Sequence, residues 1–159
     1  MRDVYEVLKE HGVPYEKYEH VAVFTTDEAE KAWTGFSGKK VKNLFLTNRK
    51  GDKYYLVSIA HDKRADLKKL GEQLCEKRLQ FVSPEGLMRY LGLTPGSVSP
   101  LGLINDEKRE VTFLLDEELL NQDTIYIHPN INTATLAIPT NEFKRFIESL
   151  GYAVVPLTV

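Results

Sequence analysis

Lys42 and Asn43 place a cationic and an amide side chain directly ahead of the apolar run 44–46. Residues 41–46 suit a buried strand, and lysine is almost never fully buried unless it is paired. A cationic residue at the start of an apolar run therefore needs a physical reason. Taken alone, the pattern favours a simpler interpretation, in which Lys42 marks the solvated end of the strand with its stem packed.

The loop 94–102 is the second segment that could do chemistry, because it is dense in Gly, Pro and Ser. Such a loop can present backbone N–H groups to a ligand, and it can also be a simple connection. The four histidines are scattered, and Cys75 is the only cysteine, so we expect no structural zinc site. We expect Cys75 to be a small buried hydrophobe.

Several familiar catalytic motifs are missing from the sequence. It contains neither a Walker nor a dinucleotide-binding fingerprint, and no Gly-x-Ser-x-Gly nucleophile elbow. The remaining possibilities are a mechanism without metal or cofactor, or no catalysis at all.

A central hairpin must position these candidates. Residues 48–52 are typical of a turn, and 54–59 of the returning strand. Other strands are expected near 15–23, 81–82, 111–116, 124–127, 134–138 and 153–155. Apolar residues at helical spacing, with capping residues and glycines at the ends, predict helices near 4–11, 27–33, 66–74, 84–91 and 140–150. We therefore expect one α/β domain over residues 1–159, with a mixed sheet.

Composition limits the classes of protein that this chain could belong to. Its 159 residues are 42% hydrophobic and 28% charged, as in soluble globular domains. No apolar run approaches the ~20 residues that cross a bilayer, the N-terminus lacks the apolar core of a signal peptide, and a single cysteine agrees with a reducing compartment. We expect a cytoplasmic protein without a membrane partner. The net charge of −2 argues against indiscriminate nucleic-acid binding but allows a local basic patch.

Three motifs occur in the order and spacing of one family: residues 41–46, 95–102 and 128–135. On these motifs the chain resembles, from end to end, the YbaK/ProX-type aminoacyl-tRNA deacylases, free-standing relatives of the editing domain in bacterial prolyl-tRNA synthetase. The segment His128-Pro129-Asn130, and His20 ahead of Thr25, resemble the branch that clears alanine from tRNA(Pro). The resemblance implies a mixed α+β fold with a barrel-like β-sheet flanked by helices.

The resemblance also implies a reaction and a set of site residues. Water would cleave the aminoacyl ester of Ala-tRNA(Pro) with help from the terminal ribose hydroxyl, and no cofactor or metal would be needed. Lys42 would hold the terminal phosphate or ribose, Asn43 would add hydrogen bonds, Gly96 would expose N–H groups to the ester carbonyl, and His128 would border the alanine pocket. Further substrate contacts are implied for His20, Thr25, Ser97, Val98, Ser99, Thr133 and Ala134.

The implied partners are the acceptor end of tRNA(Pro) and, as a further candidate, prolyl-tRNA synthetase, but not DNA. The helix 27–33, which leads into Gly35 and Gly38, is the candidate for an element that closes over the substrate. Phosphate contacts could come from the basic residues Lys39, Lys40, Arg49, Lys50, Lys53, Lys63, Arg64, Lys68 and Lys69. On helices and turns, such residues usually form a solvated face.

Two alternatives remain at this stage. The pocket could accept cysteine or serine in place of alanine, since a sequence does not display pocket volume. The chain could also be a catalytically silent module that binds tRNA or a synthetase. The intact set of Lys42, Asn43, Gly96 and His128 favours an active enzyme over the silent module.

Overall fold

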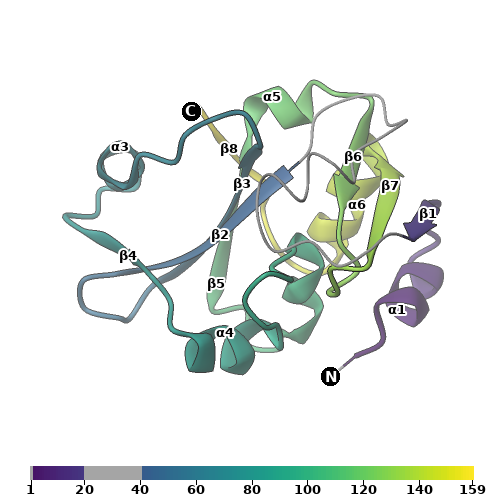
Figure 1. Cartoon of the computed structure of the whole chain (residues 1–159), viewed down its shortest axis with the longest axis horizontal. Coiled ribbons are helices and arrows are strands. Elements are labelled where there is room, and N and C mark those ends of the chain that lie inside the picture. Colours follow the sequence, from purple (N-terminus) through teal and green to yellow (C-terminus); the bar gives the residue numbers. More distant parts are fainter. Residues whose placement is uncertain (1, 20–40) are drawn as a thin grey trace.

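The computed structural model describes residues 2–19 and 41–159. Its strands form two sheets with helices around them (Figure 1). The antiparallel three-stranded sheet has the order β1 (Glu16–Glu19), β7 (Ala134–Pro139), β6 (Thr124–Ile127). The five-stranded sheet has the order β4 (Leu79–Phe81), β2 (Val41–Asn48), β3 (Tyr54–Ala60), β5 (Val111–Asp116), β8 (Val155–Leu157). This mixed, barrel-like arrangement confirms the expected fold class, although the strands divide into two sheets where the sequence predicted one.

The hairpin of β2 and β3 lies in the middle of the five-stranded sheet (Figure 1). Its register pairs Val41 with Ala60 and Asn43 with Ser58. Asn48 closes the turn, because its side-chain oxygen accepts the backbone N–H of Asp52 at 3.1 Å. The hairpin that the sequence predicted is therefore confirmed.

The described helices are α1 (Val4–Glu10), α3 (Leu67–Gln73), α4 (Pro84–Leu91), α5 (Glu117–Leu120), α6 (Thr140–Ser149) and a 3₁₀ helix, η1 (Pro100–Asn105). Apart from α6, each described helix follows a residue whose side chain caps its N-terminus. Asp3, Asp66 and Ser83 accept the free N–H groups at the starts of α1, α3 and α4. The sequence predicted these three helices and α6, and it missed η1 and α5. Helix α6 follows Pro139 without a side-chain cap, contrary to expectation.

Two hydrophobic clusters cover opposite faces of β2 and β3. The larger one contains Phe45 and Leu56 and joins this sheet to the three-stranded sheet and to α1, α4 and α6. The smaller one contains Leu46 and Val57 and includes Leu70 of α3. Because successive side chains of a strand point to opposite faces, odd-numbered residues of β2 lie on the face of the larger cluster and even-numbered residues on the face of the smaller one.

Cys75 is exposed, so the prediction of a buried cysteine was wrong. It follows the last turn of α3 with φ +58°. The N–H of Cys75 donates to the carbonyl of Glu72, and the N–H of Glu76 donates to that of Gly71 at 2.8 Å. These two bonds form a Schellman motif, in which the residue with positive φ turns the chain at the surface.

Two further predictions differ in position or fall outside the described part of the chain. The last strand is 155–157 and not 153–155, and the first described strand is 16–19. The predicted helix 27–33, together with His20, Thr25, Gly35, Gly38, Lys39 and Lys40, lies outside the described residues. None of the helices in residues 2–19 and 41–159 has the length and apolar content that crossing a membrane requires.

Candidate functional site

The side chain of Asn43 is held by two neighbours on the larger-cluster face of β2. Its amide nitrogen donates to the carbonyl of Val98 at 3.1 Å, and its oxygen accepts the hydroxyl of Ser58 at 2.5 Å. Ser58 is fully buried, directly opposite Asn43 in the hairpin. Since a hydroxyl can donate and a carbonyl can only accept, these bonds determine which end of the amide is nitrogen. One N–H bond of the amide is left over from this pair of contacts.

Ser99 ties the loop 94–99 to the end of β6. Its hydroxyl donates to the carbonyl of His128 at 2.5 Å and accepts the N–H of Leu101 at 3.2 Å, so that it also caps η1. The side chain is completely buried. Val98 and Ser99 are adjacent in the chain, so the contacts of Asn43 and those of His128 belong to one continuous network.

The ring of His128 is fixed by the segment that follows it. Its Nδ1 atom lies 3.0 Å from the carbonyl oxygen of Ala134, at the start of β7. Because a carbonyl oxygen only accepts, Nδ1 carries the proton in this contact, and the neutral ring then has its acceptor at Nε2. The chain can double back between these residues because Asn130 adopts φ +64°.

Gly96 lies at the tip of the loop, in a turn closed by the N–H of Ser97 and the carbonyl of Thr94 at 3.1 Å. Pro95 precedes Gly96, whose φ is +88°, the conformation that a type II turn requires at its third position. The turn geometry therefore accounts for a glycine here. Ser97 is buried beside it, whereas Thr133, which precedes Ala134 in the chain, is exposed.

Lys42 points to the opposite face of β2 from Asn43, because the two residues are consecutive in a strand. Its ammonium donates to the backbone carbonyl of Lys63 at 3.0 Å, in the loop that follows β3. The side chain is half-buried. The structure thus brings Asn43, Val98, Ser99, His128 and Ala134 into one network and places Lys42 beside the same strand end, on its other side.

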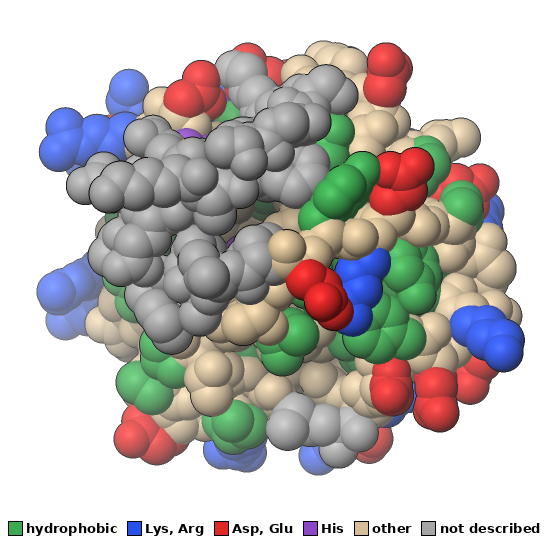
Figure 2. All heavy atoms as spheres, turned by 45° about the vertical axis from the view of Figure 1, so that its right-hand side comes forward, with side chains coloured by type: hydrophobic (Ala, Val, Ile, Leu, Met, Phe, Trp, Pro, Cys, Tyr) green, Lys and Arg blue, Asp and Glu red, His purple; other side chains and the backbone are tan. Residues whose placement is uncertain are grey.

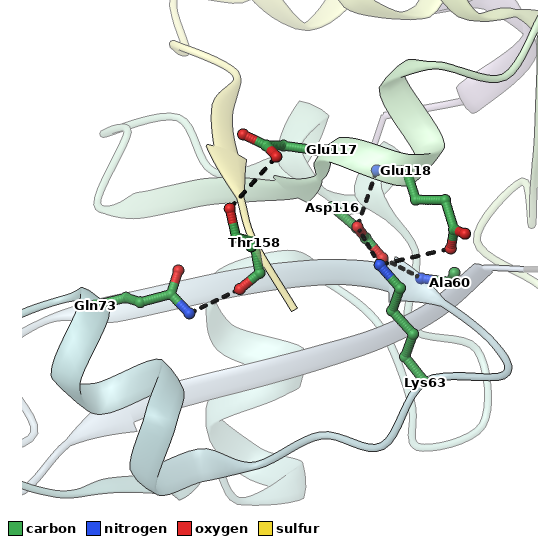
Figure 3. Close-up of polar contacts among 7 residues, drawn as sticks. All are labelled: Ala60, Lys63, Gln73, Asp116, Glu117, Glu118 and Thr158. Carbon is green, nitrogen blue, oxygen red and sulfur yellow. Dashed lines mark hydrogen bonds and ion pairs between the residues drawn. The ribbon is translucent and has the colours of Figure 1, made fainter.

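A partly buried ion pair holds the loop that contacts Lys42 (Figure 3). The ammonium of Lys63 lies 2.8 Å from Asp116 Oδ1 and 3.5 Å from Glu118 Oε2. Burial opposes the charge of Lys63, but the hydrogen bond to Asp116 and the negative charges of Asp116 and Glu118 outweigh it and raise the pKa of Lys63. The other carboxylate oxygen of Asp116 accepts the N–H of Ala60 at 2.9 Å.

Ser58 and Asp116 belong to this region, and the sequence analysis assigned neither of them a role. For each residue, its place in the sequence pattern could have indicated a role. Ser58 is the only polar residue within an otherwise apolar or aromatic strand, and the hairpin register places it opposite Asn43. Asp116 ends the apolar run of β5, and its side chain is only 1% exposed. A buried polar group needs a partner, so both residues were candidates for site contacts.

The basic residues within 41–159 do not converge on one place. Lys63 and Arg64 lie in the loop beside the end of β2, whereas Arg49, Lys50 and Lys53 lie at the opposite end of the hairpin, about 20 Å along the strand. A hollow of about 540 Å³ at that distant turn also contains the acids Asp52 and Glu76. Figure 2 shows another face, where acidic and basic side chains are interspersed among hydrophobic ones.

In residues 2–19 and 41–159, no three His, Cys, Asp or Glu side chains group closely enough to hold a metal ion.

The chain is similar to known proteins both in sequence and in structure. Residues 20–146 match the family described as the aminoacyl-tRNA editing domain. The chain is 37% identical to the prolyl-tRNA editing protein ProX of Acetoanaerobium sticklandii, over 91% of this chain and 88% of the relative. It is 33% identical to the prolyl-tRNA synthetase associated domain-containing protein 1 of Danio rerio, over 99% and 86%. A crystal structure described as a candidate trans-editing enzyme for prolyl tRNA synthetase superposes with a TM-score of 0.75 at 25% identity, covering 99% and 96%.

Proposed function

Because the chain belongs to the family of aminoacyl-tRNA editing domains, we propose that it is a single editing domain that hydrolyses the ester bond of mischarged Ala-tRNA(Pro). The names of its relatives support tRNA(Pro) as the nucleic acid and prolyl-tRNA synthetase as a partner. The observation that carries the proposal is the network that joins Asn43, the loop 96–99 and His128, with the ammonium of Lys42 at the same strand end.

In the proposed reaction, a water molecule attacks the carbonyl carbon of the aminoacyl ester. The free hydroxyl of the terminal ribose orients this water by accepting a hydrogen bond from it and relays its proton to the leaving ribose oxygen. The bond between the carbonyl carbon and the ribose oxygen breaks, the ribose oxygen takes up a proton, and alanine and uncharged tRNA leave. Because an aminoacyl ester is already activated, hydrolysis needs no nucleophilic side chain, and the protein contributes mainly by orienting the ester and stabilising its charge.

Asn43 and the turn at Gly96 supply the donors in this mechanism. Ser58 and the carbonyl of Val98 hold the amide of Asn43 in one orientation, which leaves an N–H bond that can donate to the oxygen on which negative charge develops. A donor held in place before the reaction costs no reorganisation, and loss of one such donor typically lowers kcat by about 10²- to 10³-fold.

Lys42 binds the terminal phosphate or ribose from the other side of β2. The Lys63 carbonyl takes one of its three ammonium donors among the described residues. The terminal nucleotide then lies across the end of β2, with its charged part near Lys42 and its ester near Asn43.

His128 limits the size of the amino acid. Prolyl-tRNA synthetase cannot reject alanine well, because each missing methylene lowers binding in a larger pocket by only ~1–3 kcal/mol. A second site that admits alanine and excludes proline removes the error. The contact with Ala134 fixes the ring of His128, so that it forms a rigid pocket wall.

Hydrolysis of tRNA(Pro) charged with alanine, cysteine, serine or proline tests this function, with Ala-charged tRNA(Ala) as a control for tRNA recognition. We expect rapid loss of alanine from tRNA(Pro) and no loss of proline. Preferential loss of cysteine or serine would keep the activity and change the specificity. Binding of tRNA without hydrolysis of any ester would identify a silent module.

Lys42→Ala tests the mechanism. We expect the rate of Ala-tRNA(Pro) hydrolysis to fall by about 100-fold or more, with the melting temperature nearly unchanged, because Lys42 makes one half-buried hydrogen bond. A variant that hydrolyses at the wild-type rate would exclude this role of Lys42.

A further inference from the structure

The ammonium of Lys42 depends on a loop for its position. It donates to a backbone carbonyl, that of Lys63, and not to a side chain of its own sheet. A lysine stem has four rotatable bonds and is flexible. The position of the Lys42 ammonium therefore depends on how rigidly the backbone of residues 61–66 is held.

The side chain of Lys63 anchors this backbone to β5 (Figure 3). It reaches across from the loop to Asp116, at the end of β5, with an N–O distance of 2.8 Å. Asp116 is itself rigid: one oxygen accepts the N–H of Ala60, and the other accepts the N–H of Glu118 at the start of α5. The loop is thus fastened at Ala60, where it leaves β3, and again at Lys63.

A purely stabilising role explains this ion pair poorly. The carboxylate of Asp116 is only 1% exposed, so taking it out of water costs free energy, and an ion pair with a lysine that is itself 23% exposed adds little net stability. Such a pair does supply a fixed, directional contact. The backbone carbonyl of Lys63 accepts a hydrogen bond from the ammonium of Lys42, the lysine that the proposed mechanism uses.

We infer that the Lys63–Asp116 ion pair is a positioning device for Lys42, which fixes the Lys63 carbonyl so that the Lys42 ammonium stays at the end of β2. This inference rests on the proposed function. Lys63 and Asp116 act through Lys42 and need not touch the substrate.

Steady-state kinetics of Ala-tRNA(Pro) hydrolysis with the full chain test the inference in the variants Lys63→Met, Lys63→Arg and Asp116→Asn. Lys63→Met keeps the aliphatic stem but loses the pair, and we expect kcat to fall by about tenfold. Lys63→Arg keeps the pair and should restore kcat to within about threefold of wild type. Lys144→Met, which removes an exposed charge on α6, is the matched control and should leave kcat unchanged.

Comparing the Lys63→Met and Asp116→Asn variants distinguishes a positioning role from simple electrostatic attraction of tRNA. Lys63→Met removes a positive charge and Asp116→Asn removes a negative one, so electrostatic attraction alone would move KM in opposite directions. Positioning predicts that kcat falls in both variants. An unchanged kcat in Asp116→Asn, with a lower KM, would overturn the inference.

A double-mutant cycle gives an independent readout. If Lys63 acts through Lys42, Lys63→Met should lower the residual rate of Lys42→Ala by less than about twofold. A full tenfold loss in that background would overturn the inference. If Lys63→Met does not fold, Lys63→Gln provides the same comparison. Wild-type activity of Lys42→Ala would instead overturn the proposed function, whereas wild-type kcat in Lys63→Met beside an impaired Lys42→Ala would overturn only the positioning role.

Discussion

Asn43 and Ser58 face each other near the open end of the hairpin, where Asn43 is half-buried. The hydroxyl of Ser58 donates to the amide oxygen at 2.5 Å, and Ser58 is fully buried. An amide that is not held from both ends can rotate about its last bond and exchange its nitrogen for its oxygen. The pair therefore determines whether Asn43 presents a donor or an acceptor, and the proposed mechanism needs a donor.

Ser58→Ala should lower kcat for Ala-tRNA(Pro) hydrolysis by about tenfold while KM changes little, because the donor is lost only part of the time. The free energy of unfolding should fall by about 1 kcal/mol, as for one buried hydrogen bond. Kinetics and urea unfolding measure the two effects. Ser149→Ala on α6, which also loses hydroxyl hydrogen bonds, is the matched control and should retain wild-type kcat. Equal kcat values for both variants would contradict the role of Ser58.

At the scale of elements, helix α3 ends on a residue that is poorly suited to its backbone. Cys75 has φ +58°, in the left-handed region that costs a residue with a side chain roughly 1 kcal/mol. Glycine is the usual residue at this position of a Schellman motif. Gly71 is needed two residues before the last residue of α3, since a Cβ there would lie 2.9 Å from the carbonyl oxygen of Glu76.

Cys75→Gly should raise the free energy of unfolding by about 1 kcal/mol, because glycine relieves the left-handed strain. Urea denaturation under reducing conditions measures the change. Gly71→Ala should lower the same free energy, since its methyl group meets the backbone of Glu76. A Cys75→Gly variant that is less stable than wild type would show that the thiol contributes more than the strain costs.

Tyr152 links the segment after α6 to the junction between η1 and β5. Its hydroxyl donates to the carboxylate of Asp106 at 2.8 Å, and Asp106 also accepts the N–H of Val111 at 2.9 Å. Burial, together with the hydrogen bond to Asp106 and the charge of Asp106, raises the pKa of Tyr152 well above its ordinary value of 10.0. The folded protein therefore keeps this phenol neutral at pH values where the unfolded chain ionises it.

Tyr152→Phe should lower the free energy of unfolding at pH 7 by about 1–2 kcal/mol through the loss of buried hydrogen bonds. A raised folded pKa gives a stabilisation that is complete below pH ~10 and falls as the pH rises further. The difference in the free energy of unfolding between wild type and Tyr152→Phe should therefore become smaller above pH 10. Urea unfolding of both proteins at pH 7 and near pH 11 measures it. A difference that widens with pH would contradict the assignment.

At the scale of the whole molecule, the charge balance limits how tRNA can bind. The net charge is −2, and acidic and basic side chains are interspersed on the face in Figure 2. Non-specific attraction over the whole surface is therefore weak, and binding must depend on a few local cations. Arg64 is exposed in the loop beside the Lys42 end of the hairpin, which makes it a candidate phosphate contact.

Arg64→Gln should raise KM for Ala-tRNA(Pro) severalfold and reduce the slope of log KM against log salt concentration by about 1, as for one lost phosphate contact. The value of kcat should remain close to wild type. Lys144→Gln on α6 controls for the change in net charge. If the slope of log KM against log salt concentration is the same in both variants, Arg64 does not contact a phosphate of the tRNA.

The sequence by itself determined the hairpin, the helices α1, α3 and α4, and the family to which this chain belongs. The hairpin follows from its turn residues, and α1, α3 and α4 follow from Asp3, Asp66 and Ser83, because caps and turns are interactions between residues close in the chain. The motifs at 41–46, 95–102 and 128–135 were enough to identify the editing family, which the comparisons confirm.

Only the tertiary structure decided how the candidate residues meet. Asn43 and Val98 are 55 residues apart, and Lys63 and Asp116 are 53 apart. Periodicity shows that a residue is buried but not which distant residue it touches, so Ser58 and Asp116 had no role until strands were paired. The division into two sheets escaped prediction for the same reason, because it depends on how distant segments pack. The exposure of Cys75 has a local cause, the Schellman motif after α3, which the sequence concealed because glycine is the usual residue at that position.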